Sequence, residues 1–181
     1  MTGYEVSAMY VSGLLKALKE HGLLEQVLAG VSPATRAVAA APFKQRWHPG
    51  TVTEELSFAV PRLADAQRLE DVTYEMAKRS FGPIVTPMIK VAMALTGSSP
   101  ATIFSRLQEA TDVAVRGLDI TWLPLGPTRG EVKVGYPWPI PAEVEPVWRG
   151  TLRFAFELAR TDGRVEKATL TDRTVTLPVA W

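Results

Sequence analysis

Apolar residues recur every three to four positions through most of residues 1–116, which is the spacing of one face of an α-helix. The pattern predicts an amphipathic helical stretch over residues 11–29, with Gly22 as a break inside it. Ser32 followed by Pro33 predicts the start of the next helix. Further helical segments are expected to open near Thr51, at residues 68–82, at residues 84–97 and after Ser99.

The segment from Thr51 to Glu54 has the spacing of a capping box, in which a threonine and a glutamate three residues apart cap the first turn of a helix. On this interpretation Glu54 and Glu55 belong to a solvated helix face. Asp71 and Glu75 are interpreted in the same way, because no further partner for a metal site or an acid–base step is visible.

At Leu118 the apolar period changes from 3.6 to 2, which is typical of a strand. Two strands are expected on either side of a turn at residues 123–130, then a long helix over residues 143–160, then a final hairpin. We therefore predict one α+β domain over residues 1–181. Residues 1–116 form a mainly helical layer, and this layer packs on an antiparallel sheet of order strand-strand-helix-strand-strand in residues 117–181.

The helix predicted over residues 143–160 is apolar around most of its circumference. Its polar residues form one narrow stripe, namely Glu145, Arg149, Arg153 and Glu157. A helix of this kind must bury more than one side, either inside its own domain or against another chain. The candidates for such an interface are Val147, Trp148, Phe154 and Leu158 on the helix, with Trp138 before it.

The stretch VKVGYPWPIP connects the second strand to this helix. Its three prolines fix φ and are expected to redirect the chain, while Trp138 covers one end of the core or presents an aromatic surface to a partner. Met88 and Met93 fill the core or line a ligand cavity, since methionine adapts to irregular apolar shapes. Together with Trp122 and Tyr136 they are the candidate residues for an apolar cavity.

Composition narrows the classes of function. The 181 residues are 46% hydrophobic and 22% charged, and the net charge of +1 gives no field for binding nucleic acid. The absence of cysteine excludes disulfides, thiolate zinc sites and iron–sulfur clusters. We expect no signal peptide, because Glu5 precedes the first apolar run, and no membrane span, because the run at residues 84–95 is too short. A cytoplasmic location is the resulting expectation.

The candidate chemistry is sparse. The two histidines, His21 and His48, lie far apart in the sequence and do not form a metal-ligating pair. His48 fixes a turn or, alternatively, holds haem from one side. No serine lies in a G-x-S-x-G elbow, and no glycine-rich loop with a lysine is present to bind phosphate. We expect no catalytic residues, no metal and no cofactor, and the chain is predicted not to be an enzyme.

Several segments resemble known families. SGLLKAL, LLEQVLAGVSP, RWHPGTVTEEL, SSPATIFSRLQEA, VWRGTLRFAFELAR and VEKATLTDRTVTLPVAW resemble a paralogous family of uncharacterised proteins abundant in myxobacteria. The C-terminal half is similar to the superfamily of the four-vinyl-reductase-like domain, the haem-NO-binding domain and the transport-particle subunits. That resemblance implies helices packed on an antiparallel sheet, and members that bind small molecules or proteins. Haem binding is not expected from this resemblance. The haem-binding relatives need a proximal histidine on a helix, and none of the predicted helix centres in this chain has one.

The main functional prediction is a non-enzymatic cytoplasmic interaction module that binds a partner protein, first of all a second copy as a homodimer. The alternative is a small-molecule or lipid-binding sensor domain, with an apolar cavity between the helical layer and the sheet. An enzyme of unrecognised class is the third possibility, and nothing in the sequence places a nucleophile beside a base.

Overall fold

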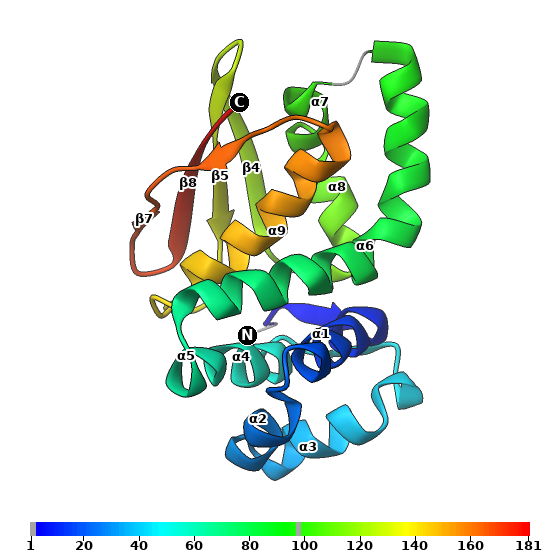
Figure 1. Ribbon diagram of the computed structural model, residues 1–181, viewed down its shortest axis with the longest axis vertical. Helices are drawn as coiled ribbons and strands as arrows, with labels where there is room; N and C mark the ends of the chain where they lie inside the picture. The colour runs from blue at the N-terminus through cyan, green and yellow to red at the C-terminus, as the bar shows by residue number, and fades with distance from the viewer. Residues whose placement is uncertain (1–2, 97–98) are drawn as a thin grey trace.

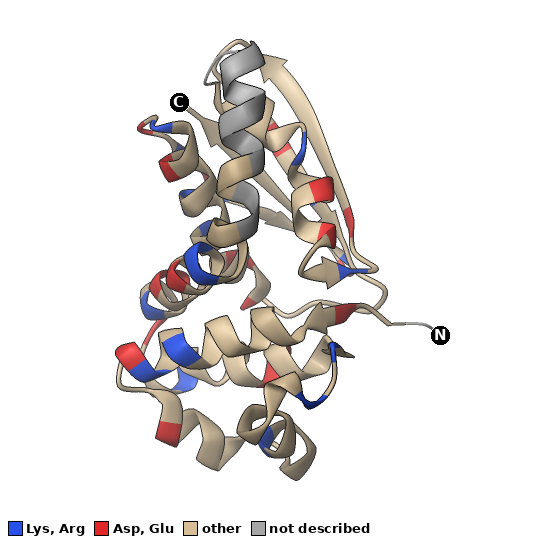
Figure 2. Ribbon diagram, turned by 90° about the vertical axis from the view of Figure 1, so that its right-hand side faces the viewer, with Lys and Arg blue, Asp and Glu red and all other residues tan. Residues whose placement is uncertain are grey.

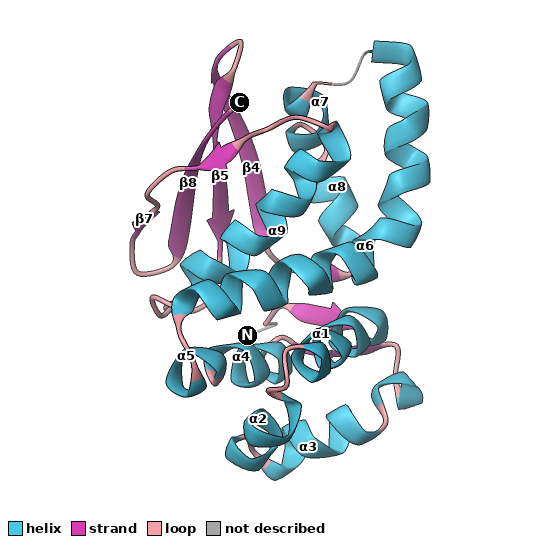
Figure 3. Cartoon of the chain, in the orientation of Figure 1, coloured by secondary structure: helices cyan, strands magenta, loops and turns pink. Residues whose placement is uncertain are grey.

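The computed structural model describes residues 3–96 and 99–181, with the side chains of residues 84, 85 and 88–96 excepted. Helices dominate the first two thirds of the chain, and an antiparallel sheet with one long helix forms the last third (Figure 3). The predicted α+β fold class is therefore confirmed.

The first helices lie together at one end of the molecule (Figure 1). The predicted break at Gly22 is confirmed, because this glycine adopts a φ of +71° that other residues rarely adopt. The Ser32 side chain accepts a hydrogen bond from the Thr35 amide, as its predicted capping role requires. The elements are α1 (Ala8–Glu20), α2 (Leu24–Gly30), α3 (Pro33–Ala40), a 3-10 turn η1 (Pro42–Lys44), α4 (Thr51–Phe58) and α5 (Val60–Leu63).

A single helix, α6 (Ala66–Thr96), replaces the two helical segments predicted at residues 68–82 and 84–97. Pro83 and Pro87 lie inside it, and Figure 1 shows that the helix bends sharply along its length. A proline removes one backbone hydrogen bond and bends a helix without always ending it. Conversely, the one helix predicted after Ser99 is divided into α7 (Pro100–Phe104) and α8 (Leu107–Asp112).

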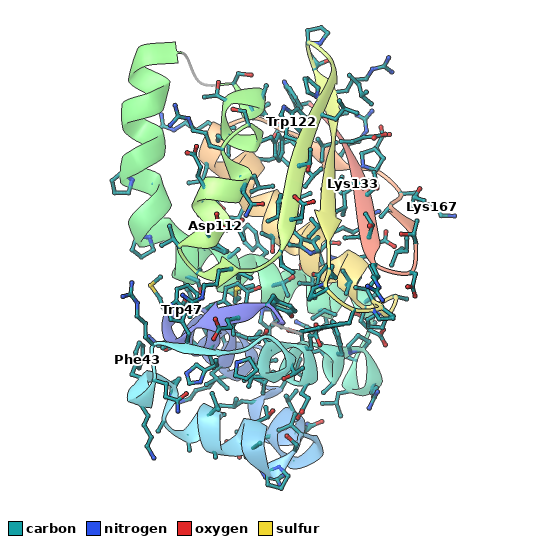
Figure 4. The ribbon with its side chains drawn as sticks, turned by 180° about the vertical axis from the view of Figure 1, so that it is seen from behind. Phe43, Trp47, Asp112, Trp122, Lys133 and Lys167 are labelled. Atoms are coloured by element: carbon teal, nitrogen blue, oxygen red, sulfur yellow. The ribbon has the colours of Figure 1, made fainter. Side chains whose placement is uncertain are left out.

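The larger sheet has the antiparallel order β4-β5-β8-β6, and β7 pairs with the same side of β8 as β6. Its strands are β4 (Asp119–Gly126), β5 (Arg129–Gly135), β6 (Arg164–Val165), β7 (Thr169–Leu170) and β8 (Thr174–Ala180). Alternate residues of the three long strands are buried on one face, which α9 (Val144–Ala159) covers. Lys133 is exposed and is labelled in Figure 4, where the strands are seen from the side away from α9.

The outer edge of this sheet is β4, which pairs only with β5 in the described part of the chain. Near its end the strand carries two exposed leucines, Leu123 and Leu125, which are 53% and 48% exposed. The pairing register shifts between Pro124 and Gly126, which is the irregularity of a β-bulge.

A second, three-stranded sheet is absent from the sequence prediction. It has the order β2-β1-β3 and consists of β1 (Glu5–Ser7), β2 (Trp47–Pro49) and β3 (Val115–Arg116). Two or three residues are too few to show an alternating pattern, so local sequence does not reveal these strands. The sheet attaches the N-terminal segment to the chain that leaves α8.

Acidic and basic residues are interspersed along the ribbon rather than gathered by sign (Figure 2). Glu70 and Asp71, on α6, form ion pairs with Arg153 of α9 at 3.1 and 2.8 Å. These pairs join the polar stripe of α9 to α6. No helix in the described part of the chain is long and apolar enough to cross a membrane.

Candidate functional site

A cavity of about 40 Å³ lies where the N-terminal helices meet α9 and the start of the larger sheet. Its walls come from segments far apart in the sequence, so only the folded chain forms it. The wall residues are Tyr4 and Val6, Tyr10 of α1, Thr53, Glu54, Ser57 and Phe58 of α4, Phe81 of α6, Thr111 of α8, Val115, Leu118, Tyr136, and Val144, Val147, Trp148 and Thr151 of α9.

Tyr4 is the residue on which the other aromatic side chains of the site converge. Its ring meets the Tyr136 ring edge-on, with centroids 5.7 Å apart, and the Trp138 ring at 5.2 Å. A Cβ atom on Gly50 would lie 2.2 Å from the Tyr4 ring, so the ring can approach the start of α4 only because this residue is glycine. The Tyr4 hydroxyl donates a hydrogen bond to Glu54 Oε1 at 2.9 Å.

Glu54 lines the cavity, and the capping box predicted for Thr51 and Glu54 is wrong. Gly50 is the N-cap residue of α4 and Thr51 is already helical, so no side chain caps this end. Glu54 Oε1 accepts hydrogen bonds from Tyr4 and from Trp138 Nε1, the latter at 3.1 Å. Burial raises the pKa of the Glu54 carboxyl, although these two hydrogen bonds lower it in part.

On the opposite wall, Trp148 Nε1 donates a hydrogen bond to the Tyr136 hydroxyl at 2.8 Å. Trp148 is buried in α9, and Tyr136 directly follows β5. Burial raises the pKa of the Tyr4, Tyr10 and Tyr136 hydroxyls, so all three tyrosines are neutral at physiological pH. The site therefore combines neutral phenols with one carboxylate.

The candidate residues named from the sequence are distributed among several places. Tyr136, Val147 and Trp148 line the cavity, and Trp138 binds its carboxylate. Trp122 lies elsewhere, stacked on Phe104 with centroids 5.0 Å apart. Phe154 is buried, and Leu158 packs against the core from a partly exposed position. Met88 and Met93 fall within α6, where their side chains lie outside the described residues.

Local sequence reasoning missed Tyr4, Tyr10, Glu54 and Ser57 as site residues. The partners of Glu54 lie 50 and 84 residues away in the chain, which no local pattern reveals. The sequence did contain one indication against the capping box. Gly50 directly precedes Thr51, and a glycine in front of a helix can itself serve as the N-cap residue. That alternative leaves Glu54 without a capping partner.

The two histidines lie outside this cavity. His48 belongs to β2, is buried, and places Nε2 2.7 Å from the Pro42 carbonyl oxygen. His21 ends α1 and lies beside Arg68, with Nδ1 3.1 Å from the guanidinium. Within the described residues, no three histidine, aspartate or glutamate side chains lie close enough together to hold a metal ion.

The fold is that of H-NOX domains. A crystal structure of the Fe(II) unliganded H-NOX protein from K. algicida superposes with a TM-score of 0.64 at 9% identity, over 96% of this chain and 95% of that chain. A solution structure of the IWP-051-bound H-NOX from Shewanella woodyi superposes with a TM-score of 0.57 at 12% identity, over 96% of this chain and 93% of that chain. A crystal structure of an oxygen-binding H-NOX domain related to soluble guanylate cyclases superposes with a TM-score of 0.52 at 11% identity, over 93% of this chain and 90% of that chain.

The sequence matches no family model and no curated protein. The resemblance to the haem-NO-binding domain is confirmed as a shared fold, since identities near 10% carry no more than that. Similarity to the myxobacterial family stays a prediction.

The cavity does not fit haem. None of the described lining residues is a histidine, the usual axial ligand of haem iron in sensors and globins. The volume of about 40 Å³ is also far below the roughly 300–1,000 Å³ of pockets that enclose drug-sized ligands. The alternative haem role for His48 finds no support, because its Nε2 faces the Pro42 carbonyl group.

The main functional prediction, a module whose function is to bind a partner protein, is wrong. That prediction was based on the apolar circumference of the helix at residues 143–160. The structure buries this surface inside the chain, between α6 and the sheet. The structures that share the fold are H-NOX domains, and their descriptions concern haem, oxygen and a bound compound. These findings favour the alternative, a domain that binds a small molecule.

Proposed function

We propose that this chain is a sensor domain for a small molecule, which binds in the cavity between the N-terminal helices and α9. The proposal extends to this chain a property of solved proteins of the same fold, one of which is an oxygen-binding domain and another of which is bound to IWP-051. The homodimer, the cytoplasmic location and the absence of catalysis stay predictions.

The observation that carries the proposal is the position and chemistry of the cavity. Residues from α1, α4, α6, α8 and α9 meet there, so a ligand would contact both the N-terminal helices and the C-terminal half at once. A ligand that binds one arrangement of these parts more tightly than another shifts the population between them. A few polar groups converging on an otherwise apolar and aromatic wall are typical of small-molecule sites.

The proposed ligand is not haem, for the reasons of ligand chemistry and volume given above. A cavity holds one water molecule when about 10–15 Å³ is open to it, so about 40 Å³ corresponds to a molecule of about three non-hydrogen atoms. Small polar molecules are therefore the ligands to test first.

The test uses the indole N–H signals of the ¹⁵N-labelled protein in two-dimensional NMR spectra. The chain has five tryptophans, and two of them report on the site: Trp148 lines the cavity and Trp138 is bound to Glu54. Trp47 and Trp122 lie elsewhere and serve as internal controls (Figure 4). We expect at least one of acetate, ethanol and ethylammonium to shift the Trp148 and Trp138 signals while leaving the controls in place.

A cavity-filling variant links the signal to the site. Val147→Phe narrows the cavity and is expected to abolish the shift, whereas Val113→Phe, at a position 37% exposed and outside the lining, leaves it intact. If none of the three probes moves the two reporter signals, or if Val147→Phe binds as the wild type does, the proposed function is wrong.

A further inference from the structure

Glu54 is the charged group of the cavity, since no other lysine, arginine, aspartate or glutamate is among its described lining residues. Both hydrogen bonds to this carboxylate use the same atom, Oε1. Oε2 accepts no hydrogen bond from any described residue. The cavity therefore carries one negative charge, and one oxygen of that carboxylate has unused capacity to accept.

Three hydroxyl groups in the wall have unused capacity as well. Tyr10, Ser57 and Thr111 line the cavity, and their side-chain hydroxyls make no hydrogen bond within the described part of the chain. Ser57 and Thr111 are buried at 5% and 4% exposure. A hydroxyl with unused capacity can bond to water or to another molecule that enters the cavity.

Six aromatic side chains share the rest of the wall with aliphatic residues such as Val115 and Val144. Tyr4, Tyr10, Phe58, Phe81, Tyr136 and Trp148 all contribute to it. The face of an aromatic ring carries partial negative charge and attracts a cation, most strongly where water is excluded. Aromatic rings around a carboxylate thus favour a molecule with an apolar part and a positive charge, and disfavour an anion.

We infer that the cavity binds a small protonated alkylamine of about three non-hydrogen atoms, with its N–H groups on Glu54 Oε2 and the wall hydroxyls and its alkyl group on the aromatic rings. This inference rests on the proposed function and names the chemical class of its ligand. The volume sets the size, Glu54 Oε2 can accept a hydrogen bond from an N–H group, and the lone carboxylate favours a positive charge.

The binding has a defined pH dependence. Three titratable side chains face Glu54 from the surrounding segments, namely Tyr4, Tyr10 and Tyr136, and all are neutral in the physiological range. Glu54 therefore sets the response at acid pH. Because burial raises its pKa, the carboxylate becomes protonated at a higher pH than an exposed glutamate, and affinity for the cation falls as pH falls.

The experiment titrates ethylammonium chloride into the ¹⁵N-labelled chain at constant ionic strength and follows the Trp148 and Trp138 indole signals. A ligand of about three non-hydrogen atoms reaches a dissociation constant on the order of 1 mM at the known ceiling of affinity per atom. Ethanol, similar in size and uncharged, is expected to bind at least about tenfold more weakly, and acetate not to bind. Tetramethylammonium, which lacks N–H groups and is larger, is expected to leave both signals in place.

Glu54→Gln is the decisive variant, because its amide oxygen can still accept from Tyr4 and Trp138 while the charge is lost. We expect at least a tenfold loss of ethylammonium affinity, with the unliganded indole signals near their wild-type positions. Glu25→Gln, an exposed glutamate in α2, is the matched control and binds as the wild type does. Ser57→Ala, which removes one hydroxyl, is expected to weaken binding by a few-fold.

The outcomes distinguish failure of the inferred ligand class from failure of the proposed small-molecule site. If ethanol or acetate shifts the reporter signals as strongly as ethylammonium does, recognition of the cation is wrong while the cavity remains a small-molecule site. If Glu54→Gln binds ethylammonium with wild-type affinity, the role assigned to the carboxylate is wrong. If no probe moves the signals, both the inference and the proposed function fail.

Discussion

The chain builds two groups of aromatic side chains along α9 and uses them differently. The first, the packed cluster, consists of Phe104, Trp122, Phe156 and Trp181, with ring centroids 5.0 to 6.2 Å apart. The second, the cavity wall, includes Tyr4, Tyr136 and Trp148. The packed cluster fills its space, and its rings stabilise one another through area burial and edge or stacked contacts.

The difference lies in the polar atoms of the rings. The packed cluster is built from Phe and Trp, with no tyrosine hydroxyl, whereas the cavity wall has three tyrosines and a carboxylate, and hydrogen bonds join these groups. The Tyr4 and Tyr136 ring centroids are 5.7 Å apart, as close as the rings of the packed cluster, so the polar atoms and not the ring spacing distinguish the two groups. The comparison teaches that aromatic content alone identifies neither a core nor a site; the position of the hydroxyls and charges does.

The largest effect is expected in the packed cluster. Phe104 is 1% exposed and contacts the three other rings of the cluster. Phe104→Ala removes this side chain and leaves a void, which should lower the free energy of unfolding by about 3–5 kcal/mol. Urea titration followed by circular dichroism measures it. Phe43→Ala, at a position 70% exposed, is the control and should stay within about 0.5 kcal/mol of the wild type. Equal losses in both variants would remove the distinction between the packed cluster and ordinary surface.

An intermediate effect is expected in the cavity wall. Tyr136→Phe keeps the ring and leaves the buried Trp148 N–H without its acceptor, which should cost about 1–3 kcal/mol in the free energy of unfolding. The Trp148 indole signal should move at the same time. Tyr74→Phe provides the control, since the Tyr74 hydroxyl bonds to Glu157 at the surface and its loss should cost about 0.5 kcal/mol or less. An unmoved indole signal in Tyr136→Phe would contradict the hydrogen bond.

The smallest effect is a change in pH dependence. Because burial raises the pKa of Glu54, the folded chain holds this proton more tightly than the unfolded chain does. The free energy of unfolding of the wild type therefore falls, relative to that of Glu54→Gln, as pH rises. The fall begins near pH 4.3, about the ordinary glutamate pKa, and is complete above the raised pKa of the folded chain. Urea titrations at acid and neutral pH should show the difference in unfolding free energy moving in favour of the variant at neutral pH. A difference that stays constant with pH, or that changes equally in Glu25→Gln, would contradict the raised pKa.

The general plan was predictable from the sequence, because it depends on local periodicity and caps. The helix at residues 143–160, the strands after Leu118 and the cap at Ser32 appear where the pattern places them. The continuity of α6 through Pro83 and Pro87 was not predictable, since local rules treat proline as a break and tertiary packing decides otherwise. Of the cavity wall, the sequence analysis named Tyr136, Val147 and Trp148, and only as aromatic or apolar candidates.

Glu54 shows why the rest of the site could not be predicted. Its spacing from Thr51 matches a local capping motif, and its actual partners, Tyr4 and Trp138, lie 50 and 84 residues away in the chain. The Glu54 side chain makes the long-range hydrogen bonds and not the local capping interaction. Sequence periodicity contains no information about such partners.

The exposed edge of the larger sheet has a consequence for solubility. An edge strand with two exposed leucines is a template on which another chain can add a strand and begin to aggregate. Pro124 lies between those leucines and has no N–H to offer to an incoming strand, and the bulge beside it bends the backbone away from a straight edge. One proline and one irregularity in pairing thus protect the chain against growth into β-structured aggregates along this edge.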